Sequence, residues 1–140
     1  MAPPPITSCA AGLKAPHPIL PPEDPAAAED SLLRACATFA DIQARASALL
    51  DRAEASRCGR IALLLLRQAE QLVPAGDAQL AIIAAARATT IEGLRAKAVV
   101  LAPFGDGGVS PALDAVHASL LRDLVALPDA PPVVRPELRA

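Results

Sequence analysis

Proline placement constrains the fold of this chain more than any other sequence feature. Eight of the 15 prolines fall within residues 3–25, and four more fall within 128–136. Proline removes a backbone hydrogen-bond donor and disfavours helical geometry for the residue before it, so both stretches are poor helix formers. We therefore predict disordered, proline-rich ends over 1–28 and 128–140, on either side of one domain over 29–127.

The first helix of the proline-poor middle is predicted from about Asp30 to Arg57, with Gly59 just beyond its end. Apolar residues recur in it alternately every three and four positions, which is typical of a helix that packs along another helix. These residues are Leu32, Ala35, Phe39, Ile42, Ala46, Leu49 and Ala53. Glu29 and Asp30 are expected to face the positive end of the helix dipole.

Two shorter helices are predicted next. The segment 60–72 contains IALLLL at 61–66, and because four consecutive leucines leave no polar face, we expect it to be the most buried part of the fold. Residues 74–77 predict a turn, with Asp77 capping a short helix that ends near Arg87. The residues of this helix expected to face inward are Leu80, Ile83 and Ala84.

The segment ATTIEGLRAKA, residues 88–98, is the most motif-like part of the chain. Thr89 and Glu92 fit a capping box, in which a hydroxyl and a carboxylate satisfy backbone donors at the start of a helix. A phosphate-binding loop needs a second glycine and a preceding strand. We therefore interpret Gly93 as a position where another backbone packs closely against a fourth helix, which ends before Pro103.

The last helix is predicted over 111–127. Ser110 and Pro111 supply its N-cap and a first-turn proline. Its regularly spaced apolar residues are Leu113, Val116, Leu120, Leu124 and Leu127. Arg122 and Asp123 are placed on its solvent side. The chain is thus predicted to be all-α, a small bundle of four or five helices.

Composition narrows the function classes. The chain has two phenylalanines and neither tryptophan nor tyrosine, which argues against an aromatic platform for stacking nucleic-acid bases. Its net charge of −2 gives no overall attraction to nucleic acid or acidic lipid. The chain has 33 alanines, and only 30 large apolar side chains lie between Glu29 and Leu127, so the core of one copy is thin. Association with another chain would enlarge it.

Cysteine and histidine placement bears on compartment and metal binding. Cys9, Cys36 and Cys58 form no C-x-x-C pair, so we expect free thiols in a reducing cytoplasm. His17 and His117 lie far apart, and no metal or cofactor is expected. The first residues contain no continuous apolar segment, so no signal peptide is expected. The IALLLL run is far shorter than the roughly 20 residues that span a bilayer.

Three segments carry a resemblance to known proteins: LLRACATF (32–39), TTIEGLRAKA (89–98) and SLLRDLVAL (119–127). On these segments the chain resembles a group of small, uncharacterised bacterial all-helical proteins that share TTIEGLRAKA-like and SLLRDLVAL-like segments. The resemblance covers about 30–127. Since that group has no assigned activity, the resemblance implies a helical fold and supplies no catalytic residues.

Cys58 and His117 are the two candidates for reactive side chains. Cys58 stands close to Arg57 and Arg60, which favour a thiolate, although the end of the preceding helix opposes it. His117 has Asp114 three positions before it and serines nearby, but no strand-turn-helix elbow of a hydrolase accompanies them. We therefore expect no enzyme activity, and the roles of Cys58 and His117 stay open.

These patterns predict a non-enzymatic helical interaction or assembly protein whose partner is itself or another protein. The predicted interaction seam consists of Leu32, Phe39, Ile42, Leu49, Leu113, Val116, Leu120 and Leu124. The alternative is a small DNA-associated regulator that contacts phosphates through Arg57, Arg60 and Arg67, because no acidic residue interrupts 57–67. The apolar segment 61–66 disfavours that alternative, since base recognition needs polar side chains on an exposed helix.

Overall fold

The computed structural model describes residues 24–105 and 110–128, and every regular element in that part of the chain is a helix. The elements are α1 (Pro25–Ala55), α2 (Gly59–Glu70), α3 (Val73–Ala85), α4 (Ile91–Leu101), the short 3₁₀ turn η1 (Ala102–Phe104) and α5 (Pro111–Ala126). The predicted all-α class is confirmed. Most of the two predicted proline-rich ends lies outside the described residues.

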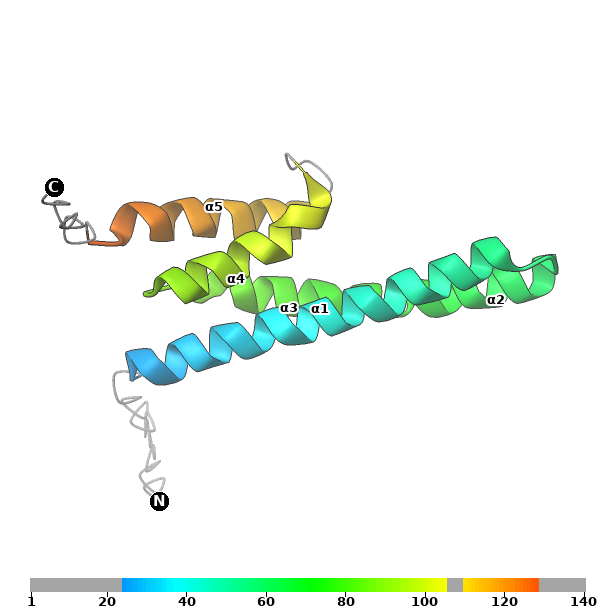
Figure 1. Cartoon of the computed structure of the whole chain (residues 1–140), viewed down its shortest axis with the longest axis horizontal. Coiled ribbons are helices and arrows are strands. Elements are labelled where there is room, and N and C mark those ends of the chain that lie inside the picture. The colour runs from blue at the N-terminus through cyan, green and yellow to red at the C-terminus, as the bar shows by residue number, and fades with distance from the viewer. Residues whose placement is uncertain (1–23, 106–109, 129–140) are drawn as a thin grey trace, which may run out of the picture.

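The helices form an elongated molecule with two parts (Figure 1). The first half of α1 packs with α3 and α4, and α5 packs on α3 and α4; we call these elements the body. The last third of α1, about residues 45–55, runs beyond the body with α2 beside it. We call this pair the two-helix arm. α2 has α1 as its main helical neighbour, so most of its surface faces away from the rest of the chain.

The hydrophobic core lies in the body. Its buried members come from α1, α3, α4, α5 and the loop before α4: Leu32, Ala35, Cys36, Phe39, Leu80, Ile83, Ala88, Leu94, Val100, Leu113 and Val116. The Phe39 and Phe104 rings pack with centroids 6.4 Å apart and planes tilted by 50°. The predicted inward positions Leu80 and Ile83 are confirmed, and Cys36, next to Ala35 of the first-helix pattern, is also buried.

α1 begins earlier than the predicted Asp30. The Asp24 side chain caps the helix by accepting a hydrogen bond from the Ala26 amide at 3.2 Å, and Pro25 occupies the first turn. Proline is tolerated there because the first amides of a helix have no intrahelical partner. Residues 25–28, predicted to be disordered, are therefore the first turn of α1.

The predicted turn at 74–77 is wrong. Pro74 lies in the first turn of α3, which starts at Val73, so Asp77 is inside the helix and does not cap it. The same tolerance of proline in a first turn explains the error. At the other end of the chain, Ser110 accepts a hydrogen bond from the Leu113 amide at 3.3 Å and Pro111 begins α5, both as predicted.

The prediction that 60–72 is the most buried segment is also wrong. Leu65 is 7% exposed, but Leu63 is 67% exposed and Leu64 is 60% exposed. Successive helical residues point about 100° apart, so four leucines in a row point around the whole helix. With α1 as its main neighbour, α2 buries one stripe, at Leu65 and Ala69, and leaves the other leucines in solvent. No helix among the described residues has the length and apolarity to cross a membrane.

Candidate functional site

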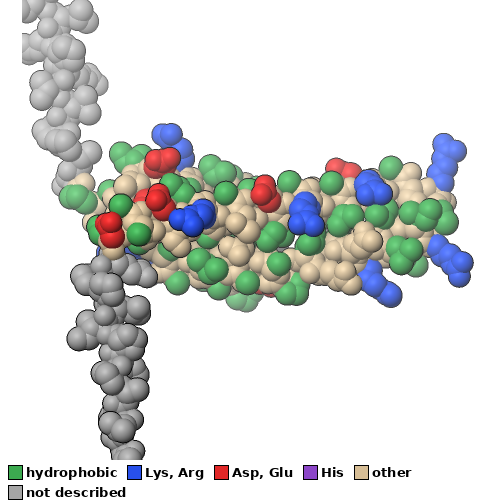
Figure 2. Space-filling model, turned by 90° about the horizontal axis from the view of Figure 1, so that it is seen from below, with side chains coloured by type: hydrophobic (Ala, Val, Ile, Leu, Met, Phe, Trp, Pro, Cys, Tyr) green, Lys and Arg blue, Asp and Glu red, His purple; other side chains and the backbone are tan. Residues whose placement is uncertain are grey.

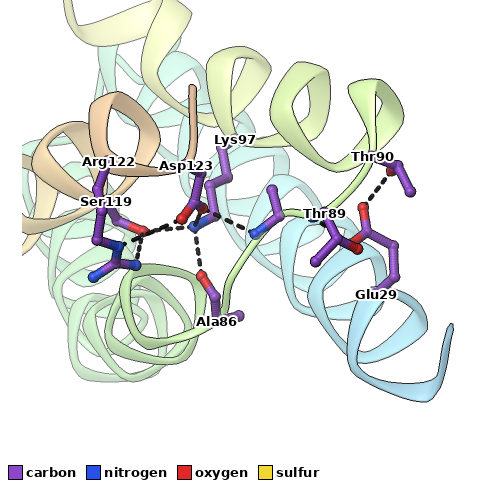
Figure 3. Close-up of polar contacts among 9 residues, drawn as sticks. Glu29, Ala86, Thr89, Thr90, Lys97, Ser119, Arg122 and Asp123 are labelled. Atoms are coloured by element: carbon purple, nitrogen blue, oxygen red, sulfur yellow. Dashed lines mark hydrogen bonds and ion pairs between the residues drawn. The ribbon is translucent and has the colours of Figure 1, made fainter. Parts of the chain in front are cut away.

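A polar cluster lies inside the body, between α4, α5 and the loop before α4 (Figure 3). The Lys97 side chain is wholly buried. Its Nζ donates hydrogen bonds of 2.6 Å each to the Ala86 carbonyl oxygen, Ser119 Oγ and Asp123 Oδ2. An ammonium group has three donors, so this set satisfies Lys97 completely.

Asp123 is the ionic partner of Lys97 and not the solvent-facing residue predicted from the sequence. Its side chain is fully buried, and its Oδ2 also accepts a hydrogen bond from the Ala88 amide at 2.9 Å. Burial raises the pKa of Asp123, but the Ala88 amide, the hydrogen bond and charge of Lys97, and the charge of Arg122 outweigh burial and lower it below its usual value. The carboxylate is therefore ionised and holds the end of α5 against the middle of α4 and the loop before it.

Glu29 makes a second polar contact, from α1 to the start of α4. Its Oε2 accepts from the Thr89 amide at 3.1 Å and the Thr89 hydroxyl at 3.0 Å, and its Oε1 accepts from the Thr90 hydroxyl at 2.5 Å. Burial raises the pKa of Glu29, but the hydrogen bonds from Thr90, Thr89 and Gly93 outweigh burial and lower it. The expected placement of Glu29 and Asp30 at the positive end of the α1 dipole is wrong, because α1 starts at Pro25 and has no acidic residue in its first turn.

The predicted capping box of Thr89 and Glu92 is wrong, because Gly93 holds the third position of α4 and has no side chain to reach back. Thr90, not Thr89, is the N-cap of α4 and accepts from the Gly93 amide at 3.0 Å. The expected close approach at Gly93 is confirmed, although the neighbour is a carboxylate and not a backbone. A Cβ at Gly93 would overlap Glu29 Oε1, and would lie 2.9 Å from Glu29 Cδ and 3.2 Å from the Ala88 Cβ.

Gly93→Ala is expected to lower the free energy of unfolding by about 1–2 kcal/mol. The added methyl group displaces the Glu29 carboxylate, whose charged hydrogen bonds are worth roughly 1.5–3 kcal/mol, and improved helix propensity returns at most about 1 kcal/mol. Urea unfolding followed by circular dichroism measures the change. Gly59→Ala is the matched control, since a Cβ at Gly59 has no atom within 4 Å. Equal effects of the two substitutions would contradict the contact.

The two carboxylates also predict how stability depends on pH. Both folded-state pKa values lie below the usual 4.5 of Glu29 and 3.8 of Asp123, so the folded chain favours their ionised forms. Their contribution is fully present above those usual values and is lost as pH falls through the lower folded values. We expect the free energy of unfolding to decrease between about pH 5 and pH 3, and to decrease less steeply in Glu29→Gln. The same slope in both proteins would contradict the role of Glu29.

The other candidate reactive residues are separate from one another. Cys58 is exposed at the tip of the arm, whereas His117 lies on α5 beside a hollow lined by Phe104 and Leu113. Ser119 is already bonded to Lys97, and Ser110 caps α5. In residues 24–105 and 110–128, no group of three or more His, Cys, Asp and Glu side chains is placed to hold a metal ion.

The residues of the predicted interaction seam pack largely within the chain. Leu32, Phe39, Leu113 and Val116 are buried in the core, and Ile42, Leu49 and Leu120 are half-buried. Leu124 is the exception, at 51% exposed. The periodic pattern therefore marks mainly contacts between helices of one copy.

The two-helix arm carries the exposed apolar surface that the sequence pattern did not predict. Ile61, Leu63, Leu64 and Leu66 of α2 are between 39% and 67% exposed. Arg57, Arg60 and Arg67, the candidate phosphate contacts, are exposed on the same arm. Figure 2 shows hydrophobic and basic side chains together over this end of the molecule, with acidic side chains mostly toward the body.

Protein-family models, curated proteins and solved structures offer no match to this chain. The resemblance noted from the sequence stays an expectation.

The body carries exposed apolar surface as well, at Leu121, Leu124 and Val125 of α5 and in a groove between α1 and α4. The groove encloses about 540 Å³ and is lined mainly by apolar side chains, among them Cys36, Phe39, Val99 and Val100. Burial raises the pKa of the Cys36 thiol, although the charge of Lys97 opposes the rise. The buried Cys36 thiol is part of the apolar lining of the groove.

Proposed function

We propose that this chain is a non-enzymatic helical interaction or assembly protein and that the two-helix arm is its contact surface. One observation carries the proposal: α2 presents four large apolar side chains to solvent although it lies on a hairpin with one main helical neighbour. Large apolar side chains that gather on one exposed helix often mark a surface that another molecule covers.

The charged side chains near the exposed apolar residues of α2 support a protein partner. Arg57, Arg60 and Arg67 stand before and after the leucine run and are exposed, and no acidic residue lies within 57–67. Protein interfaces are enriched in arginine and in large apolar side chains, and their rims are polar. The long arginine side chains also pack their apolar stems against neighbouring leucines while the guanidinium groups stay in water.

The body supports the proposal in a different way. Lys97 and Asp123 fix α5 to α4, and Glu29 fixes α1 to α4, through polar groups that are already satisfied. These contacts give the arm a rigid base and leave no donor of Lys97 for a substrate. The free thiols of Cys36 and Cys58 support the further proposal that the chain works in a reducing compartment, the cytoplasm.

The test compares two charge insertions on exposed apolar residues. Leu64→Glu changes the arm, and Ile91→Glu, at a residue that is 66% exposed on α4, changes the body. With the purified chain immobilised and proteins from its own cells identified by mass spectrometry, we expect Leu64→Glu to lose the specific partner and Ile91→Glu to retain it. The partner is the same chain or another protein. Equal retention by both variants, with folding unchanged, would overturn the proposal.

A DNA-associated regulator is the second candidate, favoured by the exposure of Arg57, Arg60 and Arg67 at one end of the molecule. Phosphate contacts make binding steeply dependent on salt. This candidate predicts a gel shift at low salt that disappears when the three arginines are changed to glutamate. The first proposal predicts no specific gel shift, because it assigns the exposed surface of the arm to a protein partner.

A further inference from the structure

We infer that the partner of the arm is a second copy of this chain, with α2 of one copy packed antiparallel on α2 of the other. The inference rests on the proposed function and names the partner that the arm fits. It is carried by the pattern of charged and apolar side chains along the outer face of α2.

The outer face of α2 is defined by its burial pattern. Leu65 and Ala69 are buried, so they form the stripe that faces α1. The opposite side of the helix presents a ridge of exposed residues at steps of three, four and three positions: Arg60, Leu63, Arg67 and Glu70. Residues at this spacing share one face of a helix. The ridge therefore points away from α1 and is free to meet another helix.

The ridge is complementary in charge to a reversed copy of itself. When two α2 helices lie antiparallel with their Leu65 residues level, Arg60 of one copy is level with Glu70 of the other, because both are five positions from Leu65. The two-fold axis makes this pair occur twice. Parallel packing would instead place Arg60 beside Arg60 and Glu70 beside Glu70, and like charges across an interface are unfavourable.

The apolar residues fit the same arrangement. Leu63 of one copy is level with Arg67 of the other, whose apolar stem can cover it. Leu64 and Leu66 lie on opposite flanks of the ridge, one position to either side of Leu65. In the antiparallel pair each of these leucines is therefore close to its own equivalent on the second copy. A single surface that satisfies itself in this way is the signature of an isologous, two-fold dimer.

An exchange of the two charges tests the register. In sedimentation equilibrium of the full chain, we expect dimers at micromolar concentration and at least about a tenfold weaker association for Arg60→Glu alone and for Glu70→Arg alone. The double variant Arg60→Glu/Glu70→Arg restores opposite charges in reversed order and is expected to associate nearly as tightly as the natural chain. Leu63→Glu is expected to give monomers. Arg95→Glu, an exposed arginine on α4, is the control and should leave association unchanged.

Circular dichroism establishes that each variant is folded before its mass is compared. The inference is overturned by a natural chain that stays monomeric at every concentration, by a dimer that Leu63→Glu leaves intact, or by a double variant no better than the single ones. These outcomes are separable from failure of the proposed function. A monomeric chain whose other protein partner is lost in Leu64→Glu would remove only this inference, whereas a Leu64→Glu chain with unchanged partners would remove the proposed function.

Discussion

Replacing Lys97 by methionine is expected to lower the free energy of unfolding by about 3–5 kcal/mol, enough to unfold much of a domain of ordinary stability. Methionine keeps most of the length and apolar volume of lysine. It removes the charge that compensates Asp123, takes the Lys97 donor from the Ala86 carbonyl, and leaves Ser119 with only the hydrogen bond from Arg122. A buried carboxylate without its ionic partner is far more costly than the pair is favourable.

Two further variants separate this effect from simple loss of a side chain. In Lys97→Met/Asp123→Leu both charges are absent, and most of the lost stability is expected to return. In Arg122→Met only a half-exposed arginine is lost, at 3.4 Å from Asp123, and the change is expected to be below about 1 kcal/mol. Denaturant unfolding midpoints of the three variants give the three changes in the free energy of unfolding. A Lys97→Met chain as stable as Arg122→Met would show that the cluster is not formed.

Leu32→Ala and Leu64→Ala are expected to differ by several kcal/mol although the chemical change is the same. Leu32 is fully buried in the body, so its truncation removes apolar contact, leaves a cavity and costs about 3–5 kcal/mol. Leu64 is 60% exposed on the arm. Its truncation in dilute solution should cost less than about 1 kcal/mol, because alanine favours the helix and little contact is lost.

Thermal or urea unfolding of the two variants, at a concentration where the midpoint of the natural chain no longer changes with dilution, checks this difference. Comparable losses of unfolding free energy in both variants would mean that Leu64 is buried within a single copy. That would agree with the sequence pattern and contradict the structure, in which Leu64 is exposed. A small loss in Leu32→Ala would place the core somewhere other than the body.

The sequence predicted those features that depend on neighbouring residues. The start of α5 follows from Ser110 and Pro111, whose capping and ring geometry act within one turn. The inward positions of α1 follow from its alternating spacing. The burial of α2 does not follow from sequence, because a run of leucines fixes which residues are apolar and says nothing of how many helices surround them.

The polar cluster shows a different limit of prediction. Lys97 stands at the same helical spacing as Leu94 and Leu101, which is a signal that its side chain faces inward. Its partners come from α5 and from the loop before α4, and Glu29 reaches Thr90 from far earlier in the chain. A local capping rule selects Thr89, whereas the folded chain uses Thr90, because Glu29 occupies the Thr89 amide and hydroxyl.

The most direct test of the contact role of α2 is the solvent exposure of its leucine methyl groups. Their paramagnetic relaxation by a soluble probe can be followed by NMR as the full chain is concentrated or as its partner is added. We expect strong relaxation at Leu63 and Leu64 in dilute protein and clear protection after association, with the Leu32 methyl groups protected throughout. Leu63 and Leu64 methyl groups that are already protected in dilute protein, or that stay equally exposed under every condition, would contradict that role.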